Sequence, residues 1–272
     1  MPSFEILCVT MHQNDFSKIK EMNIHSDVVF ANQADDTRFD AINFENHTAK
    51  MITTSTRGVG INRNLSLMYA SADICLLADD DMVFDDNVED IICSEFKAHP
   101  DADVIIFNYT TDDPERQPRV YNKTKKHRKW QRMTWGAVRV AFRLSSIQKS
   151  GNFFTTLFGG GCKYLAGEDS MWLYKARKSG LVFYVSDKFI GKVSFETSSW
   201  YTGMNEKLYF SKGAYVKATH PKTALIWNFY YSLRNSSRSK LNFAERYKWM
   251  LRGNASYDKL ISYDEYISIN KK

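Results

Sequence analysis

The sequence predicts an α/β fold with a mostly parallel central sheet flanked by helices, followed by a helical C-terminal extension. Short apolar runs at residues 4–10, 27–31 and 74–78 have the length and composition of buried strands. Segments with helical periodicity alternate with these runs, which is typical of βαβ units and a parallel sheet. Near residues 195–200 the pattern changes to helices rich in aromatic and basic residues. We therefore expect an α/β domain over residues 1–200 and a helical extension over 201–272.

The remaining elements follow the same two patterns along the chain. Further strands are expected at 51–54, 102–107, 137–144 and 181–185. Helices of the α/β part are expected at 65–70, 87–99 and 166–180. Helices of the extension are expected near 205–217, 221–233 and 241–251.

Length and composition restrict the class of protein. The 272 residues suit one large α/β domain, with or without an appended helical part. The net charge of +6, from 37 Lys and Arg against 31 Asp and Glu, favours anionic partners such as nucleotides or lipid phosphates. The four cysteines lack metal-ligand spacing and are interpreted as reduced thiols of a cytoplasmic chain. No apolar run approaches the roughly 20 residues of a membrane span, and no signal-peptide pattern is present.

Three carboxylates, Asp79, Asp80 and Asp81, directly follow the apolar strand at 74–78. In open α/β sheets the carboxyl ends of the strands are where ligands bind. Three adjacent carboxylates repel one another unless a cation or very good solvation compensates them. Mg²⁺ is often shared between such carboxylates and the phosphates of a substrate. The triplet therefore indicates a metal–diphosphate site, with a solvated acidic turn as the alternative.

A glycine-containing loop enters a helix just before the acidic strand. Arg57, Gly58, Gly60 and Arg63 lie in this loop and in the start of the helix. Free N–H groups and the positive end of the helix dipole suit a phosphate, to which the two arginines could add charge-assisted bonds. The alternative is an ordinary helix start with two surface arginines.

Two later segments also carry candidate chemistry. Residues 110–133 are strongly basic and predict either a solvated hairpin or a flap that contacts a phosphate-bearing acceptor or a membrane. Glu168 and Asp169 follow the glycine loop at 158–161 and lie in the first turn of the helix at 166–180. Acidic residues are favoured there by the helix dipole in any protein, so a purely structural role is the alternative.

Three motifs in this order resemble those of glycosyltransferase family 2 enzymes with the Rossmann-like GT-A fold. They are Arg57 to Asn64, Leu76 to Asp81, and Gly167-Glu168-Asp169. The segments 196–200 and 205–214 resemble bacterial members that build surface polysaccharides. The resemblance covers roughly residues 4–215.

The resemblance implies an inverting transfer of a sugar from a nucleotide donor, a UDP-sugar, to a saccharide or lipid-linked saccharide. It implies that Asp79 and Asp81 occupy the D-x-D positions that bind Mn²⁺ or Mg²⁺, and that Asp169, with Glu168 beside it, is the general base. The residues that it assigns to the donor nucleotide are Thr10, Gln33, Asp35, Arg57, Gly58, Asn62, Arg63, Asp79 and Asp80.

The sequence departs from the family pattern in two places. The first loop, usually Pro-x-Tyr/Phe-Asn, here reads from Thr10 to Asn14 as Thr-Met-His-Gln-Asn. Phe195 stands about where some relatives place a metal-binding histidine. The first departure weakens the assignment of base recognition, and the second leaves the metal with one or two protein ligands.

The chemistry of transfer gives the two acidic groups separate tasks. A cation held by Asp81 would neutralise the charge that develops on the departing diphosphate. An acceptor hydroxyl needs a carboxylate such as Asp169 to take its proton. We expect both groups to serve one cleft. The alternatives are a sugar nucleotidyltransferase and a non-catalytic carbohydrate- or lipid-binding module; no nucleic-acid partner is expected.

The aromatic and basic segment at 221–252 predicts peripheral membrane contact at the inner face of the plasma membrane. A helical lid or a dimer contact is the alternative for the same segment.

Overall fold

The computed structural model describes residues 2–114, 116–128, 131, 133, 135–194, 203–234 and 239–270. The chain divides into two compact units. The first consists of Met1–Arg57, Ile61–Phe154 and Trp172–Thr197, and the second of Gly58–Gly60, Thr155–Met171 and Ser198–Lys272. The second unit therefore combines the C-terminal helices with two segments that precede residue 201.

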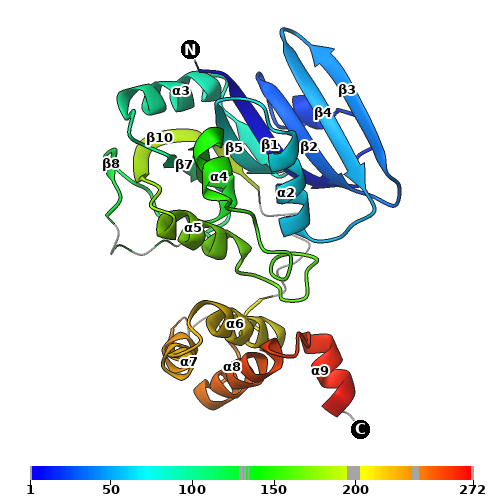
Figure 1. Cartoon of the computed structure of the whole chain (residues 1–272), viewed down its shortest axis with the longest axis vertical. Helices are drawn as coiled ribbons and strands as arrows, with labels where there is room; N and C mark the ends of the chain where they lie inside the picture. The colour runs from blue at the N-terminus through cyan, green and yellow to red at the C-terminus, as the bar shows by residue number, and fades with distance from the viewer. Residues whose placement is uncertain are drawn as a thin grey trace. The chain divides into compact units, whose positions relative to one another are not determined.

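The first unit is built on one sheet with the strand order β3-β4-β2-β1-β5-β9-β7-β10-β6, and β8 pairs with β10 (Figure 1). The strands are β1 (Phe4–Met11), β2 (Asp27–Gln33), β3 (Arg38–Phe44), β4 (His47–Thr54), β5 (Ile74–Asp79), β6 (Met82–Phe84), β7 (Val104–Thr110), β8 (Lys125–Lys126), β9 (Val140–Arg143) and β10 (Phe183–Val193).

The centre of this sheet is parallel, as the sequence predicts. β4, β2, β1 and β5 are parallel neighbours, and β10 is parallel to β7. β9 runs antiparallel between β5 and β7. In the register of β1, Val9 faces Asp79 and Thr10 faces Asn32. The carboxyl ends of β1, β2 and β5 therefore meet at one edge of the sheet.

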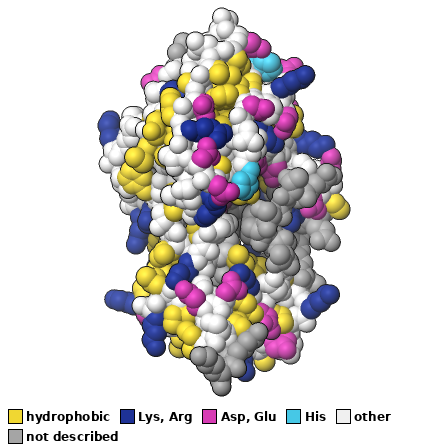
Figure 2. All heavy atoms as spheres, turned by 90° about the vertical axis from the view of Figure 1, so that its right-hand side faces the viewer, with side chains coloured by type: hydrophobic (Ala, Val, Ile, Leu, Met, Phe, Trp, Pro, Cys, Tyr) yellow, Lys and Arg dark blue, Asp and Glu magenta, His cyan; other side chains and the backbone are white. Residues whose placement is uncertain are grey.

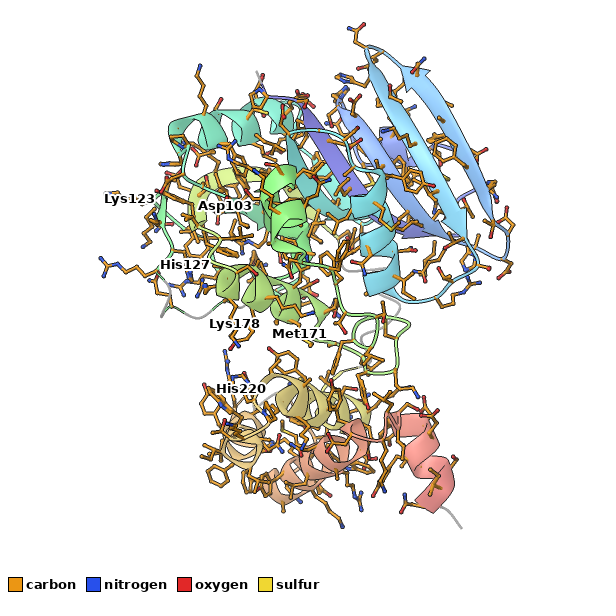
Figure 3. The ribbon with its side chains drawn as sticks, in the orientation of Figure 1. Asp103, Lys123, His127, Met171, Lys178 and His220 are labelled. Atoms are coloured by element: carbon orange, nitrogen blue, oxygen red, sulfur yellow. The ribbon has the colours of Figure 1, made fainter. Side chains whose placement is uncertain are left out.

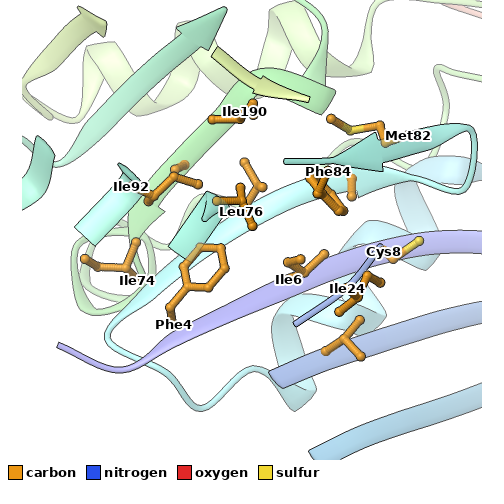
Figure 4. Packing of buried hydrophobic residues seen from close by; sticks show 14 of the residues in the cluster. Phe4, Ile6, Cys8, Ile24, Ile74, Leu76, Met82, Phe84, Ile92 and Ile190 are labelled. Atoms are coloured by element: carbon orange, nitrogen blue, oxygen red, sulfur yellow. The ribbon is translucent and has the colours of Figure 1, made fainter. Parts of the chain in front are cut away.

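Buried apolar clusters cover both faces of the sheet. Phe4, Ile6 and Cys8 belong to one cluster, whereas Leu7 belongs to the other, because alternate residues of a strand point to opposite faces. Figure 4 shows the first cluster, in which residues of β1 and β5 pack with Phe84 and Ile92.

The helices of the first unit are α1 (Lys18–Glu21), α3 (Val88–Ala98) and α4 (Leu144–Ser150). Two more helices, α2 (Val59–Tyr69) and α5 (Glu168–Lys178), each begin in a segment of the second unit and continue in the first. Figure 2 shows basic and acidic side chains interspersed on the face that it presents.

The second unit contains α6 (Glu206–Thr219), α7 (Ala224–Leu233), α8 (Phe243–Tyr257) and α9 (Tyr263–Asn270). α6 and α8 approach closely at two glycines. A Cβ on Gly213 would lie 1.9 Å from the Met250 carbonyl oxygen, and one on Gly253 would lie 1.8 Å from the Phe210 carbonyl oxygen. Among the described residues, no helix is both long enough and apolar enough to cross a membrane.

Some predicted elements differ from the structure. The strand expected at 137–144 is a 3₁₀ turn, η1 (Ala137–Arg139), followed by β9, and α4 begins at Leu144. Within the basic segment at 110–133, the strand structure described after the end of β7 is the two-residue β8, and several other residues of the segment lie outside the described part. The sequence reading also missed β3, whose exposed edge position gives a weak apolar pattern, and α9.

Candidate functional site

Asp79, the last residue of β5, is held by a buried arginine. Arg63 comes from the second turn of α2 and is 3% exposed. Its Nη2 donates to Asp79 Oδ1 over 2.9 Å, and its guanidinium lies 5.5 Å from the centre of the Phe154 ring. The positive charge of Arg63 is therefore directed at the first carboxylate of the triplet. Its predicted contact with a phosphate stays a prediction.

Asp80 is held from the neighbouring strand. The Thr10 hydroxyl, at the end of β1, donates to Asp80 Oδ2 over 2.5 Å. Lys18, in α1, places its ammonium 3.4 Å from the Asp80 backbone carbonyl and also pairs with Glu21. The sequence analysis did not identify Lys18. Its place in the first helix after β1, close to the edge of the sheet where the acidic strand ends, could have pointed to it.

Asp81 differs from its two neighbours. Its Oδ1 is buried and has no hydrogen-bond partner within the part of the chain that the structure describes. Burial, reinforced by the charges of Asp79 and Asp80, raises the pKa of Asp81 to about 7. Asp103, labelled in Figure 3, is a carboxylate whose two oxygens both accept hydrogen bonds. Its two oxygens accept from the Ser146 hydroxyl at 2.6 Å and the Val182 N–H at 2.7 Å.

Two buried asparagines connect the loops around the acidic strand. Asn62 donates from Nδ2 to the Ala31 carbonyl over 3.0 Å, which ties α2 to β2. Asn32 donates to the Gln13 carbonyl over 2.9 Å and accepts from the Gln13 N–H over 3.0 Å. The loop after β1 is thereby fixed to β2. Asn62 thus has a clear positioning role, whereas its predicted contact with the donor stays untested.

Gln33 and Asp35, at the end of β2 and in the loop after it, are two further residues that the resemblance assigns to the donor nucleotide. Gln33 ends β2 and is buried, while Asp35 is 89% exposed at its side chain. Arg57 donates to Asp35 Oδ1 and, over 2.7 Å, to the Ala34 carbonyl. Arg57 therefore ties the loop after β2 to the segment before α2, and Asp35 is an exposed carboxylate of this loop.

The acidic strand offers carboxylate oxygens, the type of ligand that hard divalent cations take. Among the described residues no three His, Cys, Asp or Glu side chains form a group that could hold a metal by themselves. Arg63 and Thr10 engage Asp79 and Asp80, so Asp81 is the carboxylate whose buried oxygen lacks compensation. A hard cation would find an unpartnered carboxylate oxygen at Asp81 and would need further ligands from a substrate or from water.

The second acidic pair lies in the second unit. Glu168 and Asp169 occupy the first turn of α5, and Glu168 Oε2 accepts from the Gly167 N–H over 3.0 Å. Gly159 has φ +113°, and a Cβ there would lie 2.9 Å from Glu168 Cδ. Gly167 has φ +127°, and a Cβ there would lie 2.6 Å from the Tyr215 ring. Both glycines are therefore required for the chain to pass so close to these side chains.

The glycine loop at the start of α2 is also part of the second unit. The Val59 N–H donates to the Gly160 carbonyl over 2.9 Å, and Gly58 has φ +120°. The helix begins at Val59, well before the range 65–70 in which the sequence predicts it. One amide at this helix start is thus occupied by the loop at 158–161, and the predicted phosphate contact there stays a prediction.

The structure brings together Thr10, Asn62, Arg63 and the acidic triplet in the first unit. Asp35 and Arg57 form a separate pair in that unit, and Gly58, Glu168 and Asp169 belong to the second unit. The expectation that both acidic groups serve one cleft stays a prediction. Phe195 and the segment 196–200 lie outside the described residues.

Comparison with known proteins identifies the fold. No family model and no curated protein matches the sequence. Among solved structures, the chain is similar to S. aureus TarS 1-349 in complex with UDP-GlcNAc, with a TM-score of 0.57, 14% identity, and coverage of 99% of this chain and 76% of that one. TarS 1-349 with UDP gives a TM-score of 0.57, 12% identity and coverage of 99% and 75%. A longer TarS structure gives a TM-score of 0.56 and 12% identity, and the match covers 99% of this chain and 46% of that one. At these identities the likeness establishes the fold, and it confirms that the chain has the predicted GT-A architecture.

Proposed function

We propose that the chain is an inverting, metal-dependent glycosyltransferase. In this proposal it moves a sugar from a nucleotide donor, a UDP-sugar, to a saccharide or lipid-linked saccharide in polysaccharide biosynthesis. The GT-A fold supports the reaction class, because TarS, which shares the fold, was solved with UDP and with UDP-GlcNAc. Fold alone does not specify activity, so the proposal depends on the residues at the acidic strand.

The observation that carries the proposal is the inequality of the three adjacent carboxylates. Arg63 engages Asp79 and Thr10 engages Asp80, whereas Asp81 keeps a buried oxygen without a partner. A solvated acidic turn, the simpler interpretation, would leave all three in water. Burying a carboxylate oxygen without a partner is costly unless a ligand compensates it.

Asp81, together with Asp79, would hold a divalent cation in this proposal. Such an ion supplies charge neutralisation to the diphosphate of the donor. Arg63 keeps Asp79 oriented through its bond to Oδ1, and Thr10 keeps Asp80 oriented through its bond to Oδ2. Asn32 and Arg57 fix the loops after β1 and β2, next to the residues assigned to the donor nucleotide.

The proposed role of Asp169 is that of general base, with Glu168 as its acidic neighbour. The acceptor oxygen forms a bond to the anomeric carbon while the bond from that carbon to the diphosphate oxygen breaks. The proton of the acceptor hydroxyl passes to the Asp169 carboxylate, and the electron pair of the broken bond leaves with the nucleoside diphosphate. Attack from the face opposite the leaving group inverts the anomeric configuration.

Asp169→Asn tests the catalytic role. We expect transfer to fall about 100-fold or more, because the amide cannot accept the proton, while donor binding stays nearly unchanged. The matched control is Asp90→Asn, which removes an exposed carboxylate from the first turn of α3. If both variants lost transfer and lost stability equally, Asp169 would have only a structural role at the start of its helix. This result would contradict its role as general base.

Slow release of UDP from UDP-sugars tests the reaction class itself. We expect release with Mn²⁺ and none with a chelator, accompanied by a rise of the melting temperature when UDP and Mn²⁺ are added together. A protein that binds sugars or lipids but shows neither effect would be a binding module. A protein that joins a nucleoside triphosphate to a sugar phosphate would be a nucleotidyltransferase. Either result would contradict the proposal.

A further inference from the structure

Helix α7 exposes five of its large apolar residues and buries its polar residues Asn228 and Ser232. Ile226 is 70% exposed and Leu225 is 62% exposed. Asn228 and Ser232, by contrast, are fully buried. At 100° per residue, the exposed apolar positions fall within about 140° of the helix circumference. They are Leu225, Ile226, Phe229, Tyr230 and Leu233, which we call the α7 face.

The inward side of α7 shows that this orientation is specified by the fold. Ser232 donates to the Asn228 carbonyl over 2.7 Å, and buried Arg246 of α8 donates to the Ser232 carbonyl over 2.9 Å. The Asn228 side chain is buried without a partner among the described residues. Turning α7 to bury its apolar residues would break the bond from Arg246. The outward apolar face is therefore part of the folded unit.

The sequence on either side of α7 carries charge of one sign, although Lys207 and Lys217 within it pair with Asp264 and Asp258. Between Glu206 and Glu245 the sequence contains no acidic residue and seven basic ones. They are Lys207, Lys212, Lys217, Lys222, Arg234, Arg238 and Lys240. Lys222 and Arg234, which flank α7, and Lys240 are exposed. An apolar helix face bordered by basic residues matches an interface that has an apolar interior and an anionic surface.

We propose that the α7 face docks on an anionic lipid surface. α7 has 10 residues, which is too short to span a bilayer, so it would lie in the headgroup region with its apolar side chains directed into the lipid. A second copy of the chain fits less well, since a two-fold contact through α7 would bring the basic residues of both copies together.

The proposal narrows the predicted membrane contact from residues 221–252 to the single helix α7. In α8, Trp249 and Met250 are buried in the core of the second unit. Phe243 and Tyr247 of α8 pack instead against Phe229, which supports the α7 face from one side. α7 is thus the contact element, and α8 is the helix that holds it. This inference is independent of the proposed transferase activity.

Flotation of the full-length protein with vesicles tests the proposal. We expect it to float with phosphatidylcholine vesicles that contain phosphatidylglycerol, and to float much less with phosphatidylcholine alone or in high salt. Ile226→Glu should lower the partition coefficient about tenfold or more, since it places a negative charge in the apolar face. Lys222→Gln should lower it roughly fivefold, the usual effect of one basic residue near an anionic surface.

The matched control is Ile269→Glu, the same substitution at a 60% exposed position in α9. It should leave flotation unchanged, and both variants should keep the wild-type melting temperature because their side chains are exposed. Equal losses in the two variants would overturn the assignment to α7. Absence of flotation by the wild type, with a dimer that Ile226→Glu converts to a monomer, would show that a second copy covers the face.

Discussion

Each compact unit contains a largely buried charged side chain that forms no ion pair among the described residues, and the two side chains have opposite charges. In the first unit it is Asp81, whose carboxylate lies beside two further carboxylates. In the second unit it is Lys212, whose ammonium contacts the Met204 sulfur at 3.9 Å and lies over the Tyr209 ring. Burial lowers the pKa of Lys212 to about 8, with Arg234 adding a smaller effect.

The difference between the two charges lies in their surroundings. The two carboxylates next to Asp81 are held in place: Asp79 by Arg63 and Asp80 by Thr10. The unpartnered oxygen of Asp81 therefore lies within a group of ordered side chains. Lys212 has an aromatic ring and a thioether as neighbours, and no carboxylate among the described residues pairs with it. We infer that Asp81 is kept for a ligand, whereas Lys212 mainly costs stability. Substitutions at Asp81, Arg63 and Lys212, with controls at Asp103 and Lys222, test this contrast.

The largest effect is expected at Asp81. Asp81→Asn should lower transfer at least about 100-fold and abolish the extra thermal shift that Mn²⁺ gives with UDP, because the proposed cation loses its main ligand. Stability without metal should not fall, since the lost oxygen has no partner to leave unpaired.

Asp103→Asn is the control for Asp81. Its oxygens accept from Ser146 and Val182, so the variant should lose about 1–3 kcal/mol of unfolding free energy in urea. The Mn²⁺-dependent shift with UDP should persist. A stability loss at Asp81 as large as that at Asp103 would mean that Asp81 is an ordinary structural carboxylate.

A smaller effect is expected at Arg63. Arg63→Met removes a buried cation from a partly exposed carboxylate, and we expect a loss of about 2 kcal/mol in unfolding free energy. Arg63→Lys keeps the charge and should recover part of this loss. Urea denaturation measures both variants. Equal stability of Arg63→Met and the wild type would show that Asp79 does not depend on this ion pair.

The sequence predicted the location of the acidic group but not the pairing within it. Apolar runs that become buried parallel strands are readable because the whole run is buried, as in β1 and β5. Thr10 and Asp80 are 70 positions apart, so their hydrogen bond depends on the register of β1 against β5. The edge strand β3 was missed because it is mostly exposed. The orientation of α7 was equally unreadable, since apolar residues lie both on its exposed side and on the side packed against the second unit's core.

The smallest effect is expected at Lys212, and it depends on pH. The folded pKa of about 8 lies below the ordinary value of 10.5, so the unfolded chain binds the proton more tightly. Wild-type unfolding free energy should therefore rise as the pH increases from about 8 to 10.5, and the penalty should be fully present at pH 7. Lys212→Met should raise it by about 1–2 kcal/mol at pH 7 and remove this part of the pH dependence.

Lys222→Met, at an exposed position, should do neither in the same urea titrations at pH 7 and 9.5. Destabilisation by Lys212→Met at pH 7 would show that the buried ammonium has a favourable partner, and the contrast with Asp81 would fail.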